Sequence, residues 1–207
     1  MTLQIGVHTV GPLQENCYLL HDLASGGAVL VDPGDEPQRL LVAIERAGAR
    51  LEAIWLTHAH VDHIGGIAGI RRIWEVPIHL HPADRQLYDR AGTIAPMFGI
   101  AWDEPPPPDV ALAEGDTVRL GVHQFAVWHL PGHAPGHVAF INETHFVGGD
   151  LLFAGSIGRT DLPGCDPAAM ERSLARVLTL DDRLHVLPGH GPATTIGRER
   201  ATNPFLG

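Results

Sequence analysis

The stretch WLTHAHVDHIGG, Trp55 to Gly66, places an apolar run directly before a dense group of ligand-capable side chains. His58, His60, Asp62 and His63 lie within six positions and are followed by a pair of glycines. Histidine and aspartate are costly to bury unless a partner or a metal ion binds them. Packing alone gives no reason to gather these residue types where a strand meets a helix. The cluster therefore predicts a metal site.

Three later stretches repeat the order of apolar run, turn and ligand-capable residue. FAVWHLPGHAPG supplies His133, HFVGGD supplies Asp150, and LHVLPGHG supplies His190. In α/β folds the loops at one end of the strands converge and form binding sites. We therefore expect seven nitrogen and oxygen donors to meet at one place: His58, His60, Asp62, His63, His133, Asp150 and His190. One tetrahedral zinc ion needs three or four ligands, so this set indicates two ions that share a bridging carboxylate.

The chain has 14 histidines, and a lone histidine is more often a surface or hydrogen-bonded core residue than a ligand. His137 is expected beside the ligands or at the start of a strand. Taken alone, Asp150 would be equally compatible with capping a helix. We expect no functional role for the remaining histidines, which are His8, His21, His79, His81, His123, His129, His145 and His185.

Length and composition limit the class of protein. The 207 residues, 44% of them hydrophobic, fit one globular domain with a sizeable core. The net charge of −10 argues against a nucleic-acid partner. No run approaches the ~20 apolar residues of a membrane span, and the N-terminal stretch lacks a secretory signal, so we expect no membrane partner and a cytoplasmic location. Cys17 and Cys165 are interpreted as free thiols, and the absence of lysine excludes a phosphate-loop lysine or a Schiff base.

Short strands and helices alternate along the chain without a repeat or a clear linker. Hydrophobic periodicity predicts strands at 15–22, 26–34, 51–56, 76–81, 117–120, 123–130, 137–142, 145–149 and 183–191, and helices at 36–48, 64–74, 82–92 and 166–180. The segment Gly92–Asp109 is expected to be a long proline-rich loop. Met97, Phe98 and Trp102 in this loop either wall the cleft or pin the loop to the core. The pattern predicts one α/β domain whose sheets are covered by helices.

The motifs resemble those of the metallo-β-lactamase superfamily. THAHVDH is similar to its H-x-H-x-D-H signature, and LPGHAPGH, GGDLLFAG and LPGHGP resemble its later metal-binding segments in order and spacing. The resemblance covers nearly the whole chain and implies a four-layer αββα sandwich. It implies one ion on His58, His60 and His133, a second on Asp62, His63 and His190, and Asp150 as the bridge. It also implies that Asp32, in LVDPGD, orients a ligand histidine.

Within this superfamily, the segments ENCYLL, GRTD and TNPFL resemble the short bacterial members of the glyoxalase II, or hydroxyacylglutathione hydrolase, group. This resemblance implies hydrolysis of a thioester of a small anionic thiol by a hydroxide that bridges the ions and that Asp62 orients. Arg159, in GSIGRTD, is expected to hold a substrate carboxylate, or else to pair with Asp161. We expect residues 1–207 to form a single domain without the C-terminal helical domain that grips glutathione in typical glyoxalase II enzymes.

Several alternatives remain open at this point. Nitrogen and oxygen donors suit zinc, iron and manganese, and we expect zinc. An iron-dependent persulfide dioxygenase of the same superfamily shares GRTD and most of the ligands. A lactone, phosphodiester or β-lactam hydrolase is a second alternative. A di-iron electron-transfer domain is disfavoured, because such domains commonly have Glu where His60 stands. The sequence does not predict the oligomeric state, and we interpret Cys165 as a loop thiol near the cleft.

Overall fold

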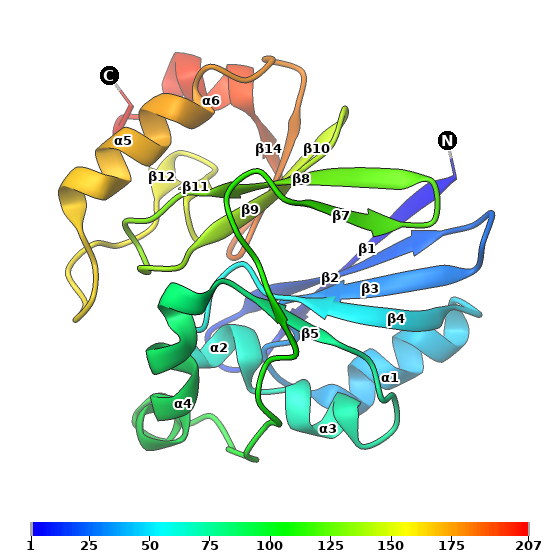
Figure 1. Ribbon diagram of the computed structural model, residues 1–207. Helices are drawn as coiled ribbons and strands as arrows, with labels where there is room; N and C mark the ends of the chain where they lie inside the picture. The colour runs from blue at the N-terminus through cyan, green and yellow to red at the C-terminus, as the bar shows by residue number, and fades with distance from the viewer. Residues whose placement is uncertain (1, 207) are drawn as a thin grey trace.

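The computed structural model describes residues 2–206, which form two six-stranded sheets packed face to face with helices on both outer sides (Figure 1). The first sheet contains, in spatial order, β1 (Leu3–Val10), β2 (Glu15–Asp22), β3 (Gly27–Val31), β4 (Arg50–Trp55), β5 (Ile78–Leu80) and β6 (Val110–Ala111). The second contains β14 (Thr194–Thr195), β13 (His185–Pro188), β10 (His145–Gly149), β9 (Val138–Ile141), β8 (His123–His129) and β7 (Thr117–Leu120). The predicted αββα sandwich is confirmed.

Helices of the N-terminal half cover the first sheet, and helices of the C-terminal half cover the second (Figure 1). The first group comprises α1 (Pro37–Arg46), α2 (Val61–Ile64), α3 (Ile67–Arg71) and α4 (Arg85–Ile94), with 3-10 turns η1 (Pro82–Asp84) and η2 (Ala95–Phe98). The second group comprises α5 (Pro167–Val177) and α6 (Ile196–Thr202). A small hairpin, β11 (Leu152–Phe153) and β12 (Ser156–Ile157), follows β10. Among residues 2–206, every helix is too short or too polar to cross a membrane.

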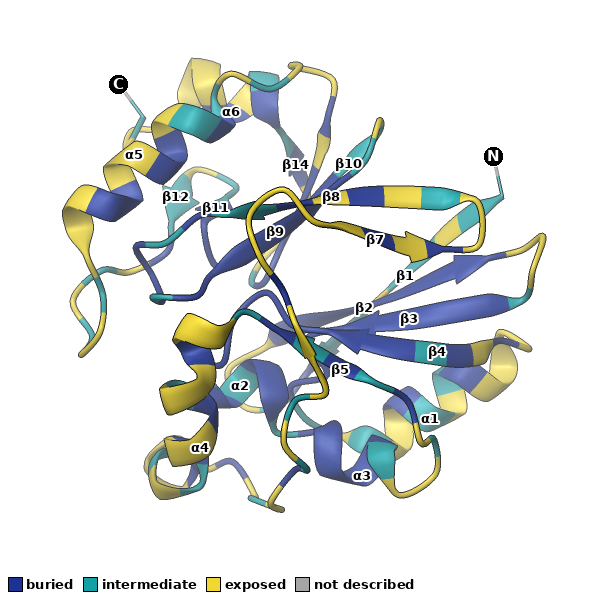
Figure 2. Cartoon of the chain, viewed as in Figure 1, coloured by how far each residue is buried: buried dark blue, intermediate teal, exposed yellow. Residues whose placement is uncertain are grey.

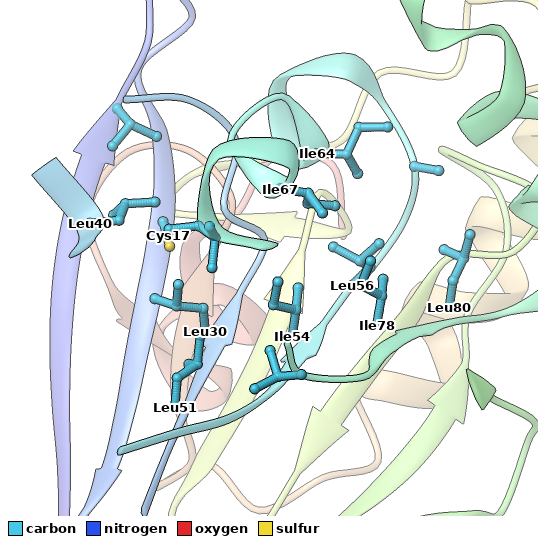
Figure 3. Packing of buried hydrophobic residues seen from close by; sticks show 14 of the residues in the cluster. Cys17, Leu30, Leu40, Leu51, Ile54, Leu56, Ile64, Ile67, Ile78 and Leu80 are labelled. Carbon is cyan, nitrogen blue, oxygen red and sulfur yellow. The ribbon is translucent and has the colours of Figure 1, made fainter. Parts of the chain in front are cut away.

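Strands β2, β3 and β4 are buried along nearly their whole length, as Figure 2 shows, because they lie between the helices and the second sheet. Alternate side chains point to opposite faces of a strand. Leu30 and Ile54 therefore pack beneath the helices, beside Ile64 and Ile67 (Figure 3). Side chains on the opposite face of these strands, such as Val29, Val31 and Ala53, pack into the core between the two sheets. These strands thus contribute to two cores and consist of nearly continuous apolar runs.

Aromatic side chains fill the core between the two sheets. Trp55, at the end of β4, is 1% exposed and contacts Phe125 and Phe140 of the second sheet at ring-centroid distances of 5.4 and 5.2 Å. Trp55 stands three residues before His58, so this packing anchors the strand end from which the ligand-rich loop departs.

Parallel pairing brings the predicted ligands to one edge of the sandwich. β3 and β4 are parallel and pair Val31 with Trp55, so the chain leaves both strands at the same edge. β10 and β13 are also parallel, and both run towards that edge. The two sheets are joined there by a hydrogen bond from the Val138 N–H to the Thr57 carbonyl. Segments far apart in sequence therefore meet at this edge.

The structure corrects three expectations. The helix predicted at 64–74 is shorter, because α3 covers only Ile67–Arg71, and the unpredicted α2 ends at Ile64, with Gly65 and Gly66 between the two helices. The segment Gly92–Asp109 begins within α4, continues into η2, and is not simply a loop. Strand β1 and helix α6 were not predicted. β1 is a half-buried edge strand with irregular alternation, and α6 has only 7 residues, so neither carries a clear periodicity.

The apolar residues of Gly92–Asp109 differ in burial. Trp102 packs against the core under the first sheet, and a Cβ atom added to Gly92 would lie 2.5 Å from its Nε1 atom. Ile100 is buried as well. Met97, in contrast, is 81% exposed. The second half of this segment is therefore pinned to the core.

Candidate metal centre

The four residues of the opening motif occupy a sharp change of direction after β4. His60 has an extended backbone and is the N-cap of α2, whereas Asp62 and His63 lie within this four-residue helix. One turn of helix points consecutive side chains in different directions. As a result, His58 and His60 lie with His133 in one group of possible metal ligands, and Asp62 and His63 lie with His190 in a second group.

The first group consists of three histidine nitrogens that converge on one point. His60 Nδ1 lies 3.1 Å from His58 Nε2 and 2.8 Å from His133 Nε2. Nitrogens at the ~2.0–2.1 Å ligand distance of a tetrahedral zinc ion are about 3.3–3.4 Å apart. The three nitrogens therefore require only a slight expansion to surround an ion of that size.

The other ring nitrogen of two of these histidines is held by an oxygen atom. His58 Nδ1 lies 3.1 Å from Thr57 Oγ1, and His133 Nδ1 lies 2.8 Å from the backbone carbonyl oxygen of Arg159. A carbonyl oxygen only accepts, so the proton of the neutral His133 ring is on Nδ1. This arrangement leaves Nε2 of His133 with a free lone pair directed at its neighbours, as in ligand histidines.

The second group consists of Asp62, His63 and His190. His190 Nε2 lies 3.3 Å from Asp62 Oδ2, and His190 follows the end of β13. His63 is fully buried, and its Nδ1 atom lies 3.0 Å from Asp32 Oδ2. Gly189 permits the close approach of these segments, because a Cβ atom there would lie 2.1 Å from Asp150 Oδ1.

The carboxylate of Asp150 lies between the two groups. Its Oδ1 atom is 3.4 Å from His63 Nε2, and its Oδ2 atom is 3.4 Å from His133 Nε2 and 3.6 Å from His190 Nε2. Burial acts to raise the pKa of Asp150, but the neighbouring His63 and the other histidines hold it below its usual range. The carboxylate is therefore ionised: Oδ1 faces the second group through His63, and Oδ2 lies between His133 of the first group and His190 of the second.

The donor set fits divalent cations. Among residues 2–206, His63 Nε2 and Asp150 Oδ1 are buried nitrogen and oxygen atoms without a hydrogen-bond partner, and such groups are costly unless something binds them. Burial, together with the neighbouring histidines, lowers the pKa of His58, and it lowers the pKa of His60 to about 3. Both rings are therefore neutral near pH 7, which is the form that binds a metal ion.

Asp32, which the family resemblance implies to orient a ligand histidine, lies beside His58 and His63. It is 2% exposed, and its backbone has the left-handed φ of 50°. Its Oδ1 accepts from the Thr57 N–H at 2.7 Å, and its Oδ2 accepts from the Thr57 hydroxyl at 2.6 Å. Asp32, His58 and His63 are close enough to form a third possible ligand group. Because both Asp32 oxygens already accept hydrogen bonds, we interpret Asp32 as a support for its neighbours.

Two further buried residues around the centre, Asp84 and Glu15, were not predicted from the sequence. The side chain of Asp84 accepts hydrogen bonds from Ala59 and Gly136, which belong to two different ligand-bearing loops. Glu15 is 1% exposed, its Oε1 lies 3.9 Å from His63 Nδ1, and burial raises its pKa well above the usual value. In the sequence, Asp84 has the appearance of an acidic residue in the first turn of the predicted helix 82–92, and Glu15 that of a strand residue.

His137 and Cys165 are also close to the ligands. His137, at the boundary of β9, is fully buried and accepts the Asp150 N–H at its Nε2 atom, 3.1 Å away, so the expectation that it lies beside the ligands is confirmed. Cys165 Sγ donates to the His133 carbonyl oxygen at 3.0 Å. Within residues 2–206, the ligand groups contain none of the eight other histidines.

Arg159 is positioned by an acidic neighbour. Its guanidinium is exposed and makes two hydrogen bonds to Asp161, from Nε at 2.7 Å and from an Nη atom at 2.9 Å. This is the ion pair that the sequence offered as the alternative to a substrate clamp. The backbone of Arg159 also contributes to the centre, because its carbonyl oxygen holds His133.

Comparison with known proteins places this centre in a family. The sequence model of the metallo-beta-lactamase superfamily matches residues 10–190. Hydroxyacylglutathione hydrolase GloC of Haemophilus influenzae is 36% identical over 209 residues, which cover 99% of this chain and 98% of that protein. The crystal structure of TTHA1623 in a di-iron-bound form is 49% identical, has a TM-score of 0.90, and matches 97% of this chain and 100% of that one. The BLEG-1 B3 metallo-beta-lactamase structure is 37% identical, with a TM-score of 0.91 and coverage of 98% and 99%.

Proposed function

Because the chain belongs to the metallo-β-lactamase superfamily, we propose that it is a binuclear metal-dependent hydrolase that cleaves thioesters of hydroxyacylglutathione type. Metal binding and membership of a superfamily of metallo-hydrolases form the basis of this proposal. The finer elements are the two ions, their seven ligands, the thioester substrate and a small anionic thiol as the product.

One observation carries the proposal: a single buried carboxylate, Asp150, faces both ligand groups at once. His63 lies on one side of this carboxylate and His133 on the other, each 3.4 Å from a different oxygen. We assign one ion to His58, His60 and His133, the other to Asp62, His63 and His190, and the shared position to Asp150. The relative with two bound iron ions supports the assignment of two metal ions to this centre. Zinc, iron and manganese all suit these nitrogen and oxygen donors.

Divalent ions supply, when bound, an activated water and a polarised carbonyl group. The protein orients these components. Asp62, held 3.3 Å from His190, carries a carboxylate that can accept a hydrogen bond from the attacking water. The buried walls around His58 and His63 exclude bulk solvent from the inner side of the centre and strengthen its electrostatic interactions. A thiolate leaves readily, so no strong general acid is needed on the leaving-group side.

The thioester preference rests on the relative that is named a hydroxyacylglutathione hydrolase, which this chain matches along nearly its whole length. Arg159 is our candidate for holding a carboxylate of the thiol. A substrate carboxylate would have to compete with Asp161 for the guanidinium. A planar guanidinium can bind a carboxylate through two parallel hydrogen bonds, so the two carboxylates would use the same geometry.

The test is metal analysis of freshly purified protein together with a substrate screen. We expect about two divalent ions per chain and hydrolysis of lactoylglutathione, measured as the release of free thiol. Oxygen consumption with glutathione persulfide, in the absence of thioester hydrolysis, would replace the proposal with an iron-dependent dioxygenase. Hydrolysis of a lactone or a β-lactam without thioesterase activity would retain the metal centre and refute the substrate assignment.

A further inference from the structure

The carboxylate of Asp84 is directed away from the helix that it precedes. Asp84 is the residue before α4, where an aspartate ordinarily accepts a hydrogen bond from an amide of its own first helical turn. No such bond is formed here. Its Oδ2 instead accepts the Ala59 N–H at 3.0 Å, and its Oδ1 accepts the Gly136 N–H at 2.5 Å. The two acceptor atoms therefore serve residues that are 25 and 52 positions away.

The two amides belong to the loops that carry the first ligand group. Ala59 stands between His58 and His60, and Gly136 follows His133 in the same turn. One carboxylate thus joins the loop after β4 to the loop before β9. Each of the three nitrogens of the first group comes from one of these two loops. The second group depends on other contacts, chiefly the one between Asp32 and His63.

The contact is closely fitted. Asp84 is fully buried, and burial raises its pKa to about 6 even though two backbone amides favour the ionised form. A Cβ atom added to Gly136 would lie 2.9 Å from Asp84 Cγ and 2.7 Å from Asp84 N. Any side chain at position 136 would therefore displace Asp84. Burying the Asp84 carboxylate costs desolvation energy. In return, the carboxylate joins the loop of Ala59 to the loop of Gly136.

We propose that Asp84 is a positioning residue for the first metal ion: it sets the separation between the His58–His60 loop and His133. This inference rests on the proposed metal centre and deepens it. Its consequence is selective, because loosening this contact affects the first ion and leaves the Asp62–His63–His190 position intact. Partners that hold ligand residues in place typically change metal affinity by about 10–100-fold, and Asp84 acts through the backbone, so we expect about tenfold.

The experiment compares Asp84→Asn with the wild type and with Asp109→Asn. An asparagine has one oxygen and one NH₂ group, so one of the two amides would face a donor. Asp109 is the control, because its carboxylate also accepts a hydrogen bond from a backbone amide, that of Ile78 at 2.9 Å. This contact lies at the start of β5, away from the ligand loops. Zinc is titrated into each metal-free protein against a chelating competitor. Anomalous diffraction from crystals at one equivalent of zinc then locates the ion that is retained.

We expect Asp84→Asn to weaken zinc binding about tenfold at the His58–His60–His133 position only, with both affinities unchanged in Asp109→Asn. Equal losses at both positions would mean that Asp84 is merely structural, and unchanged affinities would also overturn the inference. A wild type that binds no divalent ion would refute the proposed function itself. If Asp84→Asn does not fold, Gly136→Ala repeats the test, because its added methyl group displaces the Asp84 carboxylate. We expect the same selective loss of zinc affinity. Equal losses at both positions, or unchanged affinities, would overturn the inference.

Discussion

Asp32 determines which nitrogen of His63 carries the proton. Its Oδ2 atom lies 3.0 Å from His63 Nδ1 and, as a carboxylate oxygen, can only accept. The proton of neutral His63 is therefore on Nδ1, and the lone pair of Nε2 is directed towards Asp150, 3.4 Å away. The substitution Asp32→Asn keeps the size of the side chain and changes this preference, because the amide oxygen is needed by the Thr57 N–H and the NH₂ group then faces His63.

The magnitude follows from one buried mismatch. To bind an ion through Nε2, His63 must keep its proton on Nδ1, where it would meet the donor NH₂ group of the asparagine. A buried donor without an acceptor costs about 1–3 kcal/mol. Since 1.4 kcal/mol corresponds to a factor of ten, zinc affinity at the His63 position should fall about 5- to 150-fold. The effect at His58 should be smaller, because the Thr57 hydroxyl can still accept from His58 Nδ1.

Competitive zinc titration of the metal-free proteins measures this effect, with Asp109→Asn as the control for the loss of a carboxylate elsewhere. The expected pattern is the reverse of that for Asp84→Asn, with the larger loss at the Asp62–His63–His190 position. If Asp32→Asn bound both ions as tightly as the wild type, the argument that Asp32 selects the protonation state of His63 would be refuted. Equal losses at both positions would point to a general loosening of the edge of the sandwich.

Four further measurements test other parts of the structure. Asp150→Ala should lose bound metal and hydrolytic activity together, and full metal occupancy with full activity would exclude Asp150 as the bridge. Within the described part of the chain, the pKa is lowered, chiefly by burial, in eight histidines, among them His58 and His60, whereas it is raised in four histidine and carboxyl groups, namely His63, His190, Glu15 and Asp84. On balance the unfolded chain takes up more protons below pH about 6.5 than the folded chain, so the unfolding free energy of the metal-free protein, from urea titrations, should fall as the pH drops from 7 to 5, by up to about 1.4 kcal/mol per pH unit for each additional proton, and a flat profile would contradict this. Phe140→Ala should lower the unfolding free energy by about 3–5 kcal/mol in the same assay, since the ring is fully buried between the sheets, and a loss under 1 kcal/mol would contradict that packing. Arg159→Ala should raise KM for lactoylglutathione but not for an uncharged thioester, whereas equal effects on both would assign Arg159 to the loop.

The residues of the proposed metal centre could be predicted because they are marked by local sequence. A strand-like apolar run followed by a turn places the next side chain at a strand end, and this pattern recurs at His58, His133, Asp150 and His190. The strands themselves follow from hydrophobic patterning, which is a short-range property of the chain. The H-x-H-x-D-H spacing carries the same information in compact form. A family resemblance then supplied the sandwich architecture, which periodicity alone leaves open.

The residues that hold the ligands in place could not be predicted in this way. Asp84 lies in the first turn of the predicted helix 82–92, yet its carboxylate accepts hydrogen bonds from amides 25 and 52 residues distant. Glu15 lies in an apolar strand, and its proximity to His63 arises only when β2 packs beside the ligand loop. The start of α3 was likewise misplaced at Ile64, because the apolar spacing continues across Gly65 and Gly66. Local patterning thus determined which side chains face the edge of the sandwich. Tertiary packing decided which buried oxygen faces which amide or ring nitrogen, because a hydrogen bond depends on distances of a few tenths of an ångström between segments that the sequence keeps apart.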